Sequence, residues 1–211
     1  MTIKTFTFNP IQENTYLVYD ETNEAVVIDA GCVSDIEKRI LKNYIDVNEL
    51  TLKGVWNTHL HFDHQFGNKF LYTTYGVMPE AGKEDEYLLE DMVAHVRSFG
   101  LDVKEDAQPL GGYITDGQEL KLGNSIFTAF HVPGHSPGSM AFYDEKEGVL
   151  FAGDVLFRGS IGRTDLPGGN YATLINSITR KLLPLPDSTI VYSGHGPTTT
   201  IGYERKNNPF L

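Results

Sequence analysis

The sequence predicts an α+β fold made of two similar halves, because short apolar runs of strand length alternate with helical patterns and one stretch echoes another. Tyr19–Glu21, a polar turn and the apolar run Ala25–Ile28 recur as Tyr143–Glu145, a second polar turn and the run Val149–Phe151. This echo predicts two related halves that face each other, with loops from both meeting at one site.

Strand patterns fill the first part of the chain. We expect strands at Ile3–Phe8, Thr15–Tyr19, Ala25–Ile28 and Leu50–Trp56. Before the last of these, Ser34 and Glu37 form a capping box that predicts the start of a helix. Its expected inner stripe is Ile36, Ile40 and Leu41.

A longer helix is expected at Glu80–Phe99, where apolar residues recur at helical spacing and Gly100 can cap the end. We expect this helix to cover the sheet. His95 lies within it and is interpreted as a surface or packing residue rather than a ligand. Asp102–Leu110 is polar and predicts a loop between the two halves.

In the second part of the chain the strand pattern resumes at Tyr113. It continues through Leu120–Leu122, Ser125–Val132, Ser139–Tyr143, Val149–Ala152 and Thr189–Tyr192. Asn170 is expected to cap a helix that Pro184 stops, and a short polar tail is expected after Pro197.

The stretch Thr58–His64 places three histidines and an aspartate directly after a predicted strand. His59 and His61 are two positions apart, so in an extended segment they project the same way and can share one ion. Asp63 and His64 turn elsewhere and can hold a second ion. Because imidazole and carboxylate suit zinc, iron and other transition metals, the stretch predicts a metal site, the alternative being unrelated surface histidines.

Three more candidate ligands stand in glycine-rich bends straight after predicted strands, namely His135, Asp154 and His195. Glycine allows a sharp turn and close backbone approach, so each side chain is expected at the rim of a sheet. His131 lies inside a strand pattern and is expected to pack or to form hydrogen bonds there.

Composition excludes several classes of protein. A formal net charge of −11 argues against a nucleic-acid partner, because phosphate contacts require clustered Lys and Arg. No apolar run approaches the roughly 20 residues that span a bilayer, and Met1–Pro10 does not resemble a signal peptide. We therefore expect a cytoplasmic protein without a membrane partner. The single cysteine, Cys32, is expected to be a small half-buried residue rather than a nucleophile.

The pattern His-x-His-x-Asp-His at His59–His64, followed by His135, Asp154 and His195, resembles the metallo-β-lactamase fold superfamily along nearly the whole chain. The resemblance implies a four-layer αββα sandwich with the site at the sheet edges. It implies one domain over residues 1–211, with similar halves at about 1–110 and 111–211. In this family pattern one metal would be held by His59, His61 and His135, the second by Asp63, His64 and His195, with Asp154 bridging both.

The resemblance also implies a binuclear hydrolase. Two divalent ions, with zinc expected and iron or manganese as alternatives, would share a hydroxide that attacks the substrate, and Asp63 would help to place or deprotonate the water. Asp154–Gly169 is similar to short glyoxalase II-like (hydroxyacylglutathione hydrolase-like) enzymes, which implies a small thioester substrate such as S-lactoylglutathione. Arg163 is a candidate to bind the thiol carrier or to pair with Asp165, and Arg158 is a weaker candidate for the same contact.

Other interpretations stay open. Long glyoxalase II enzymes carry a tyrosine shortly after the last histidine, where this sequence has Gly196-Pro197, so the thiol carrier is not determined. His59, His135 and Asp154 would also suit a mononuclear Fe(II) persulfide dioxygenase. A non-catalytic scaffold is a third hypothesis, and the sequence does not determine the oligomeric state.

Overall fold

The computed structural model describes residues 1–90, 92–101, 103 and 105–211. Asp91, within the expected helix Glu80–Phe99, lies outside the described residues, as do Asp102 and Lys104 within the expected loop Asp102–Leu110.

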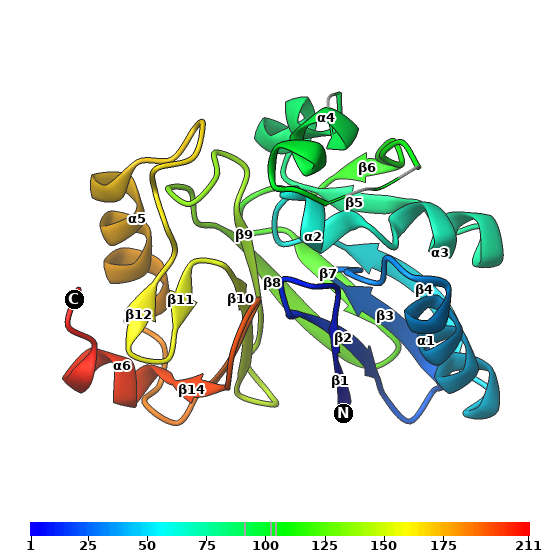
Figure 1. Cartoon of the computed structure of the whole chain (residues 1–211). Coiled ribbons are helices and arrows are strands. Elements are labelled where there is room, and N and C mark those ends of the chain that lie inside the picture. The colour runs from blue at the N-terminus through cyan, green and yellow to red at the C-terminus, as the bar shows by residue number, and fades with distance from the viewer. Residues whose placement is uncertain (91, 102, 104) are drawn as a thin grey trace.

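Two six-stranded sheets form the centre of the molecule (Figure 1). The first has the order β1-β2-β3-β4-β5-β6 and consists of Thr2–Phe8, Glu13–Tyr19, Glu24–Ile28, Thr51–Trp56, Pro79–Ala81 and Gly112–Tyr113. The second has the order β14-β13-β10-β9-β8-β7 and consists of β7 Glu119–Leu122, β8 Ser125–His131, β9 Met140–Asp144, β10 Val149–Gly153, β13 Ile190–Ser193 and β14 Thr199–Thr200. A small ribbon pairs β11 (Leu156–Phe157) with β12 (Ser160–Ile161).

The helices lie on the outer faces and at one edge of the sheets. They are α1 Asp35–Val47, α2 Phe62–Gln65, α3 Asn68–Tyr75, α4 Met92–Ser98, α5 Tyr171–Ser177 and α6 Ile201–Asn207, with a 3₁₀ helix η1 at Lys83–Leu89 and a π turn η2 at Ile178–Leu182. Ser34 begins α1 with the predicted capping box, and the Asn170 side chain caps α5 as expected. None of the helices in the described part of the chain is long and apolar enough to cross a bilayer.

The two halves repeat one topology. In the first, β2 and β3 form an antiparallel hairpin, α1 follows, and β4 returns parallel to β3. In the second, β9 and β10 form the hairpin, α5 follows, and β13 returns parallel to β10. The repeated sequence pattern therefore corresponds to a repeated arrangement of strands and helix. The first sheet ends with β6, slightly beyond the expected boundary near residue 110.

Four layers result from burying both faces of each sheet, which confirms the expected αββα sandwich (Figure 1). The inner faces pack on each other through residues such as Trp56, Phe127 and Phe142. The outer face of the first sheet packs on α1 and α3, and that of the second packs on α5 and α6. The loops at the ends of the strands are left uncovered by this packing, and these loops carry the candidate site.

The expected inner stripe of α1 is wrong in part. Leu41 is fully buried together with Ile45, whereas Ile36 and Ile40 are 62% and 48% exposed. Residues four apart share one face of a helix, so Leu41 and Ile45 define the face that packs on the sheet. Ile36 and Ile40 lie to the side of that face.

The expected helix over Glu80–Phe99 is also wrong, because its first residues belong to β5 and η1 and only α4 is α-helical. The reason is strand pairing, because Glu80 pairs with both β4 and β6 and so cannot begin a helix. Asp85 in η1 then accepts hydrogen bonds from other segments. Nor does α4 cover the sheet, since Met92 and Val96 pack with Phe62 of α2 and with Phe66. Gly100 ends the segment with φ of +76°, as predicted.

The expected polar tail after Pro197 is wrong, because β14 and α6 occupy it. The Thr200 side chain caps α6 by accepting a hydrogen bond from the Tyr203 amide. Glu204 is fully buried and accepts hydrogen bonds from Thr199 Oγ1 and the Gly159 amide. Glu204, a charged residue whose sequence context suggests an exposed position, therefore holds α6 against the β11–β12 ribbon.

Cys32 is fully buried rather than half-buried. Burial raises the pKa of its thiol to about 12, so the thiolate that reacts as a nucleophile does not form at neutral pH.

We expect Leu41→Ala to lower the free energy of unfolding by about 2–5 kcal/mol, because it removes a fully buried side chain of α1. Ile36→Ala, on the same helix, should change it by less than about 0.5 kcal/mol because Ile36 is exposed. Urea unfolding at fixed metal content measures both. Equal losses would contradict the packing of α1 described above.

Candidate metal centre

The seven candidate ligands gather where strands of both sheets end. They lie after β4 and in α2 (His59, His61, Asp63 and His64), between β8 and β9 (His135), after β10 (Asp154) and after β13 (His195). Parallel strands bring their carboxyl ends to one edge, so segments far apart in sequence converge there. The structure brings all seven together.

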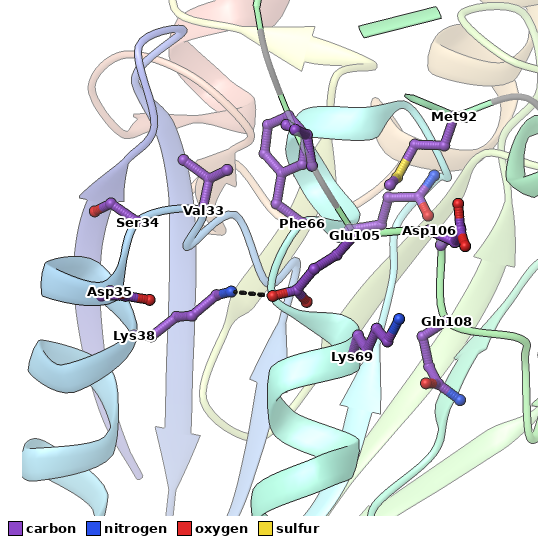
Figure 2. A pocket seen from close by; sticks show the side chains of 13 residues that line it. Val33, Ser34, Asp35, Lys38, Phe66, Lys69, Met92, Glu105, Asp106 and Gln108 are labelled. Atoms are coloured by element: carbon purple, nitrogen blue, oxygen red, sulfur yellow. Dashed lines mark hydrogen bonds and ion pairs between the residues drawn. The ribbon is translucent and has the colours of Figure 1, made fainter. Parts of the chain in front are cut away.

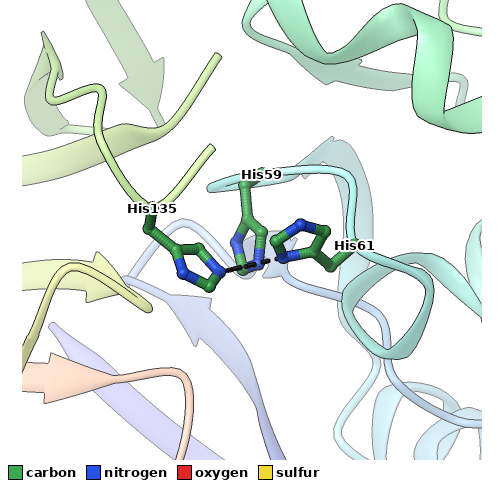
Figure 3. A group of neighbouring side chains, drawn as sticks. All are labelled: His59, His61 and His135. Carbon is green, nitrogen blue, oxygen red and sulfur yellow. Dashed lines mark hydrogen bonds between the residues drawn. The ribbon is translucent and has the colours of Figure 1, made fainter. Parts of the chain in front are cut away.

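Three histidines form the first group (Figure 3). His61 Nδ1 lies 2.9 Å from His135 Nε2, which lies 3.3 Å from His59 Nε2, and the three rings point toward one another. Burial and the neighbouring imidazoles hold the pKa of His59 well below its ordinary value and lower that of His61 to about 3. Neutral imidazoles present lone pairs, which is the state that binds a metal ion.

Asp63, His64 and His195 form the second group. Asp63 Oδ2 lies 3.3 Å from His195 Nε2 and 3.7 Å from His64 Nε2. Asp154 stands between the groups, with one carboxylate oxygen 3.5 Å from His64 Nε2 and the other 3.7 Å from His135 Nε2. Asp154 therefore lies near histidines of both groups.

Carboxylates dominate the electrostatics of the second group. Burial alone would lower the pKa of His64 and of His195, but Asp63 and Asp154 outweigh it and raise both. Burial would likewise raise the pKa of Asp154, yet His64 and the other histidines lower it. In the absence of metal ions, protonated His64 and His195 thus balance the negative charge of Asp63 and Asp154. Bound divalent cations would balance the same charge.

Two buried polar atoms test whether the site fits metal ions. His64 Nε2 and Asp154 Oδ1 have no hydrogen-bond partner among the described residues, although burying an unpaired polar group is costly. The two atoms lie 3.5 Å apart, and both are common ligand atoms for divalent ions. The residues present fit a metal centre.

The far side of three of the rings, those of His135, His195 and His64, is held by a second contact. His135 Nδ1 donates to the carbonyl of Arg163 at 2.8 Å, and His195 Nδ1 donates to that of Gln12 at 3.2 Å. His64 Nδ1 donates to Asp29 Oδ2 at 3.0 Å. Such contacts fix the tautomer and orientation of a ligand, leaving Nε2 to face the centre.

Asp29 is a residue of the candidate site that the sequence analysis missed. It is buried with φ of +53°, and besides His64 it accepts hydrogen bonds from the amide and hydroxyl of Thr58, each at 2.7 Å. A signal existed, because Asp29 directly follows β3 as Asp154 follows β10 in the repeated half. Asp29 also lies near His59, but its oxygens are engaged, so it positions ligands.

Asp85 is a second residue that was missed. Its Oδ2 accepts hydrogen bonds from Ser136 Oγ at 2.6 Å and from the Leu60 amide at 3.2 Å, and its Oδ1 accepts one from the Gly138 amide at 2.6 Å. One buried carboxylate thus ties the segment carrying His59 and His61 to the loop carrying His135. No ligand spacing in the sequence marks it.

A cleft of about 450 Å³ lies over the metal centre. Its floor contains five of the candidate ligands, and its walls are Ile11, Phe62, His95, Phe99, Phe157, Arg163 and Leu166. A separate cavity of about 290 Å³, where Lys38 pairs with Glu105, contains none of the candidate ligands among the described residues that line it (Figure 2). The cleft is therefore the place where a substrate can meet the metal centre.

The two candidate arginines differ in position. Arg163 lines the cleft and pairs with Asp165 through two contacts of 2.7 Å. Arg158 is not among the residues that line the cleft and stacks over the ring of Tyr203. His131 bonds to the Pro137 carbonyl at 2.8 Å, as expected, and His95 packs against Phe62 and Phe99.

A family model described as the metallo-beta-lactamase superfamily matches residues 8–195. The chain belongs to this superfamily. The superfamily fold and the clustered histidines and carboxylates together indicate divalent metal ions.

Within the metallo-beta-lactamase superfamily, the chain is similar to the hydroxyacylglutathione hydrolase GloC of Haemophilus influenzae, with 39% identity over 212 residues covering 100% of this chain and 98% of that protein. The crystal structure of BLEG-1 B3 metallo-beta-lactamase matches with TM-score 0.89 and 42% identity, covering 100% and 99% of the two chains. That of TTHA1623 in a di-iron-bound form matches with TM-score 0.88 and 38% identity, covering 99% and 100%.

Asp85→Asn should weaken metal affinity about 10- to 100-fold, because an amide cannot accept all three hydrogen bonds that hold the ligand loops. Competition with a chelator measures this. Glu84→Gln, an exposed change in the same 3₁₀ helix, is the matched control and should bind metal as the parent does. Parent-like affinity in Asp85→Asn would contradict the positioning role.

Proposed function

We propose that this protein is a binuclear metal-dependent hydrolase of small thioesters, with S-lactoylglutathione as the first substrate to test. The observation that carries the proposal is Asp154, whose two oxygens face the two ligand groups. The similarity to GloC supports the thioester class. A small molecule fits the 450 Å³ cleft over these groups.

His59, His61 and His135 would hold one ion, Asp63, His64 and His195 the other, and Asp154 would bridge them. When bound, two divalent ions supply Lewis acidity for the thioester carbonyl and lower the pKa of water toward about 7. Zinc, iron and manganese all suit this donor set, and the di-iron form of TTHA1623 supports iron as well as zinc.

Asp63 is the residue to which we assign proton transfer. Although burial favours its neutral form, His64 and His195 lower the pKa of Asp63, so the carboxylate is ionised at neutral pH. Its Oδ2 lies at the floor of the cleft, where it can orient a water molecule and accept its proton.

Arg163 would contact the thiol carrier. Two of its N–H groups bind Asp165, which holds the guanidinium in place, and its other N–H groups stay available to a polar group of the carrier. Arg158 is not among the residues that line the cleft, so it remains the weaker candidate for this contact. Because the site takes ligands from both halves, we propose that residues 1–211 act as one domain. We also propose a cytoplasmic location, which the single buried free thiol fits.

Metal analysis and a thioester assay test the hydrolase proposal. We expect about two ions per chain and hydrolysis of S-lactoylglutathione that falls at least about 100-fold in Asp63→Asn. Asp35→Asn, an exposed change in α1, should keep parental activity. Fewer than one ion per chain with no hydrolysis that depends on Asp63 would refute the proposal, and hydrolysis of ampicillin in place of thioesters would redirect it to β-lactams.

A second candidate, an Fe(II) persulfide dioxygenase, is favoured by one observation. His135 Nε2 lies 3.3 Å from His59 Nε2 and 3.7 Å from Asp154 Oδ2, so His135 neighbours both other members of a two-histidine, one-carboxylate set. Oxygen uptake by iron-loaded protein with glutathione persulfide is the distinguishing measurement. If there is none, this second candidate is eliminated.

A further inference from the structure

The cleft has an aromatic wall that the metal centre does not need. Phe62, His95 and Phe99 form a triangle of edge contacts, with ring centroids 5.1 Å apart for Phe62 and Phe99, 5.5 Å for Phe62 and His95, and 5.3 Å for His95 and Phe99. All three line the cleft. Phe62 immediately precedes Asp63, so the triangle adjoins the floor where reaction would occur.

This wall leaves apolar surface uncovered. Phe99 is 47% exposed, and Ile11, which also lines the cleft, is 38% exposed. The attachment of α4 does not require Phe99, because Met92 and Val96 are buried against Phe62 and Phe66. Exposed aromatic surface inside a concave site is available to an apolar ligand group.

The distribution of charge in the cleft also favours an apolar ligand group beside this wall. Among the described residues that line it, Arg163 is the one lysine or arginine, and its charge is already balanced by Asp165. The side chains of Phe62 and Phe99 offer no hydrogen bond to a hydroxyl group near the carbonyl, and His95, with its ring nitrogens, is the single polar member of the wall. Covering that hydroxyl with them would cost free energy, whereas covering an alkyl or aryl group would release it.

We propose that Phe62, His95 and Phe99 bind the acyl group of the substrate, so that thioesters of aryl or longer alkyl acids are preferred over the hydroxyacyl thioester S-lactoylglutathione. The acyl group lies against this wall, which belongs to the first half, and the thiol carrier lies toward Arg163 in the second. This assignment deepens the proposed thioester hydrolase and rests on it.

Binding of inert thioethers to the metal-loaded protein tests the wall without turnover. S-benzylglutathione carries an aryl group where the acyl group would be, and S-methylglutathione lacks it. We expect the benzyl compound to bind about tenfold more tightly, and Phe99→Ala to remove most of that preference. Phe210→Ala is the matched control, because Phe210 is also 47% exposed and does not line the cleft.

Measurements of turnover then distinguish the wall assignment from the proposed thioester hydrolase activity. In Phe99→Ala, the ratio of kcat/KM for S-phenylacetylglutathione to that for S-lactoylglutathione should fall about tenfold, and in Phe210→Ala it should not change. If Phe99→Ala abolishes the preference for the benzyl compound but the protein hydrolyses no thioester, the wall assignment stands and the hydrolase proposal is refuted. Equal binding of the two thioethers, or a ratio unchanged in Phe99→Ala, would overturn the wall assignment.

Discussion

The rest of the structure depends on the carboxylates that are gathered at the ends of the strands. Asp29, Asp63 and Asp154 lie within one small volume together with five imidazoles, and removing so much charge from water is costly unless each group is paired. Without metal ions the histidines pair them, and with metal ions the cations would. The strands, loops and outer carboxylates all serve to bring these groups to one place and to hold them there.

Duplication of the half-fold explains how distant segments supply one site. Each half presents the end of a hairpin strand and of the parallel strand that follows the helix, and in both halves an aspartate follows the hairpin strand. The two aspartates have diverged: Asp154 faces both ligand groups, whereas Asp29 supports His64 and Thr58 from behind. A symmetric framework thus carries an asymmetric centre.

Much of this could be predicted from local sequence, and the remainder depends on tertiary contacts. Strand positions, the capping box at Ser34 and the polar bends after strands follow from period and turn chemistry, and these placed all seven candidate ligands. Asp85 and Glu204 could not be found in this way, since a single acidic residue in a polar segment looks the same whether it faces solvent or a ring of amide donors. The face of α1 was misjudged because Ile36 and Ile40 satisfy helical spacing nearly as well as Leu41 and Ile45 do.

Cys32 gives the molecule an internal reporter. Its sulfur lies against Gly67, at the junction between α2, which carries two candidate ligands, and α3, and the side chain has no access to solvent. A thiol reagent can therefore react with it only when the packing around Cys32 opens, and the rate of labelling measures how often that happens. Since the chain has one cysteine, the signal comes from a single place, close behind the metal centre, with no engineered probe.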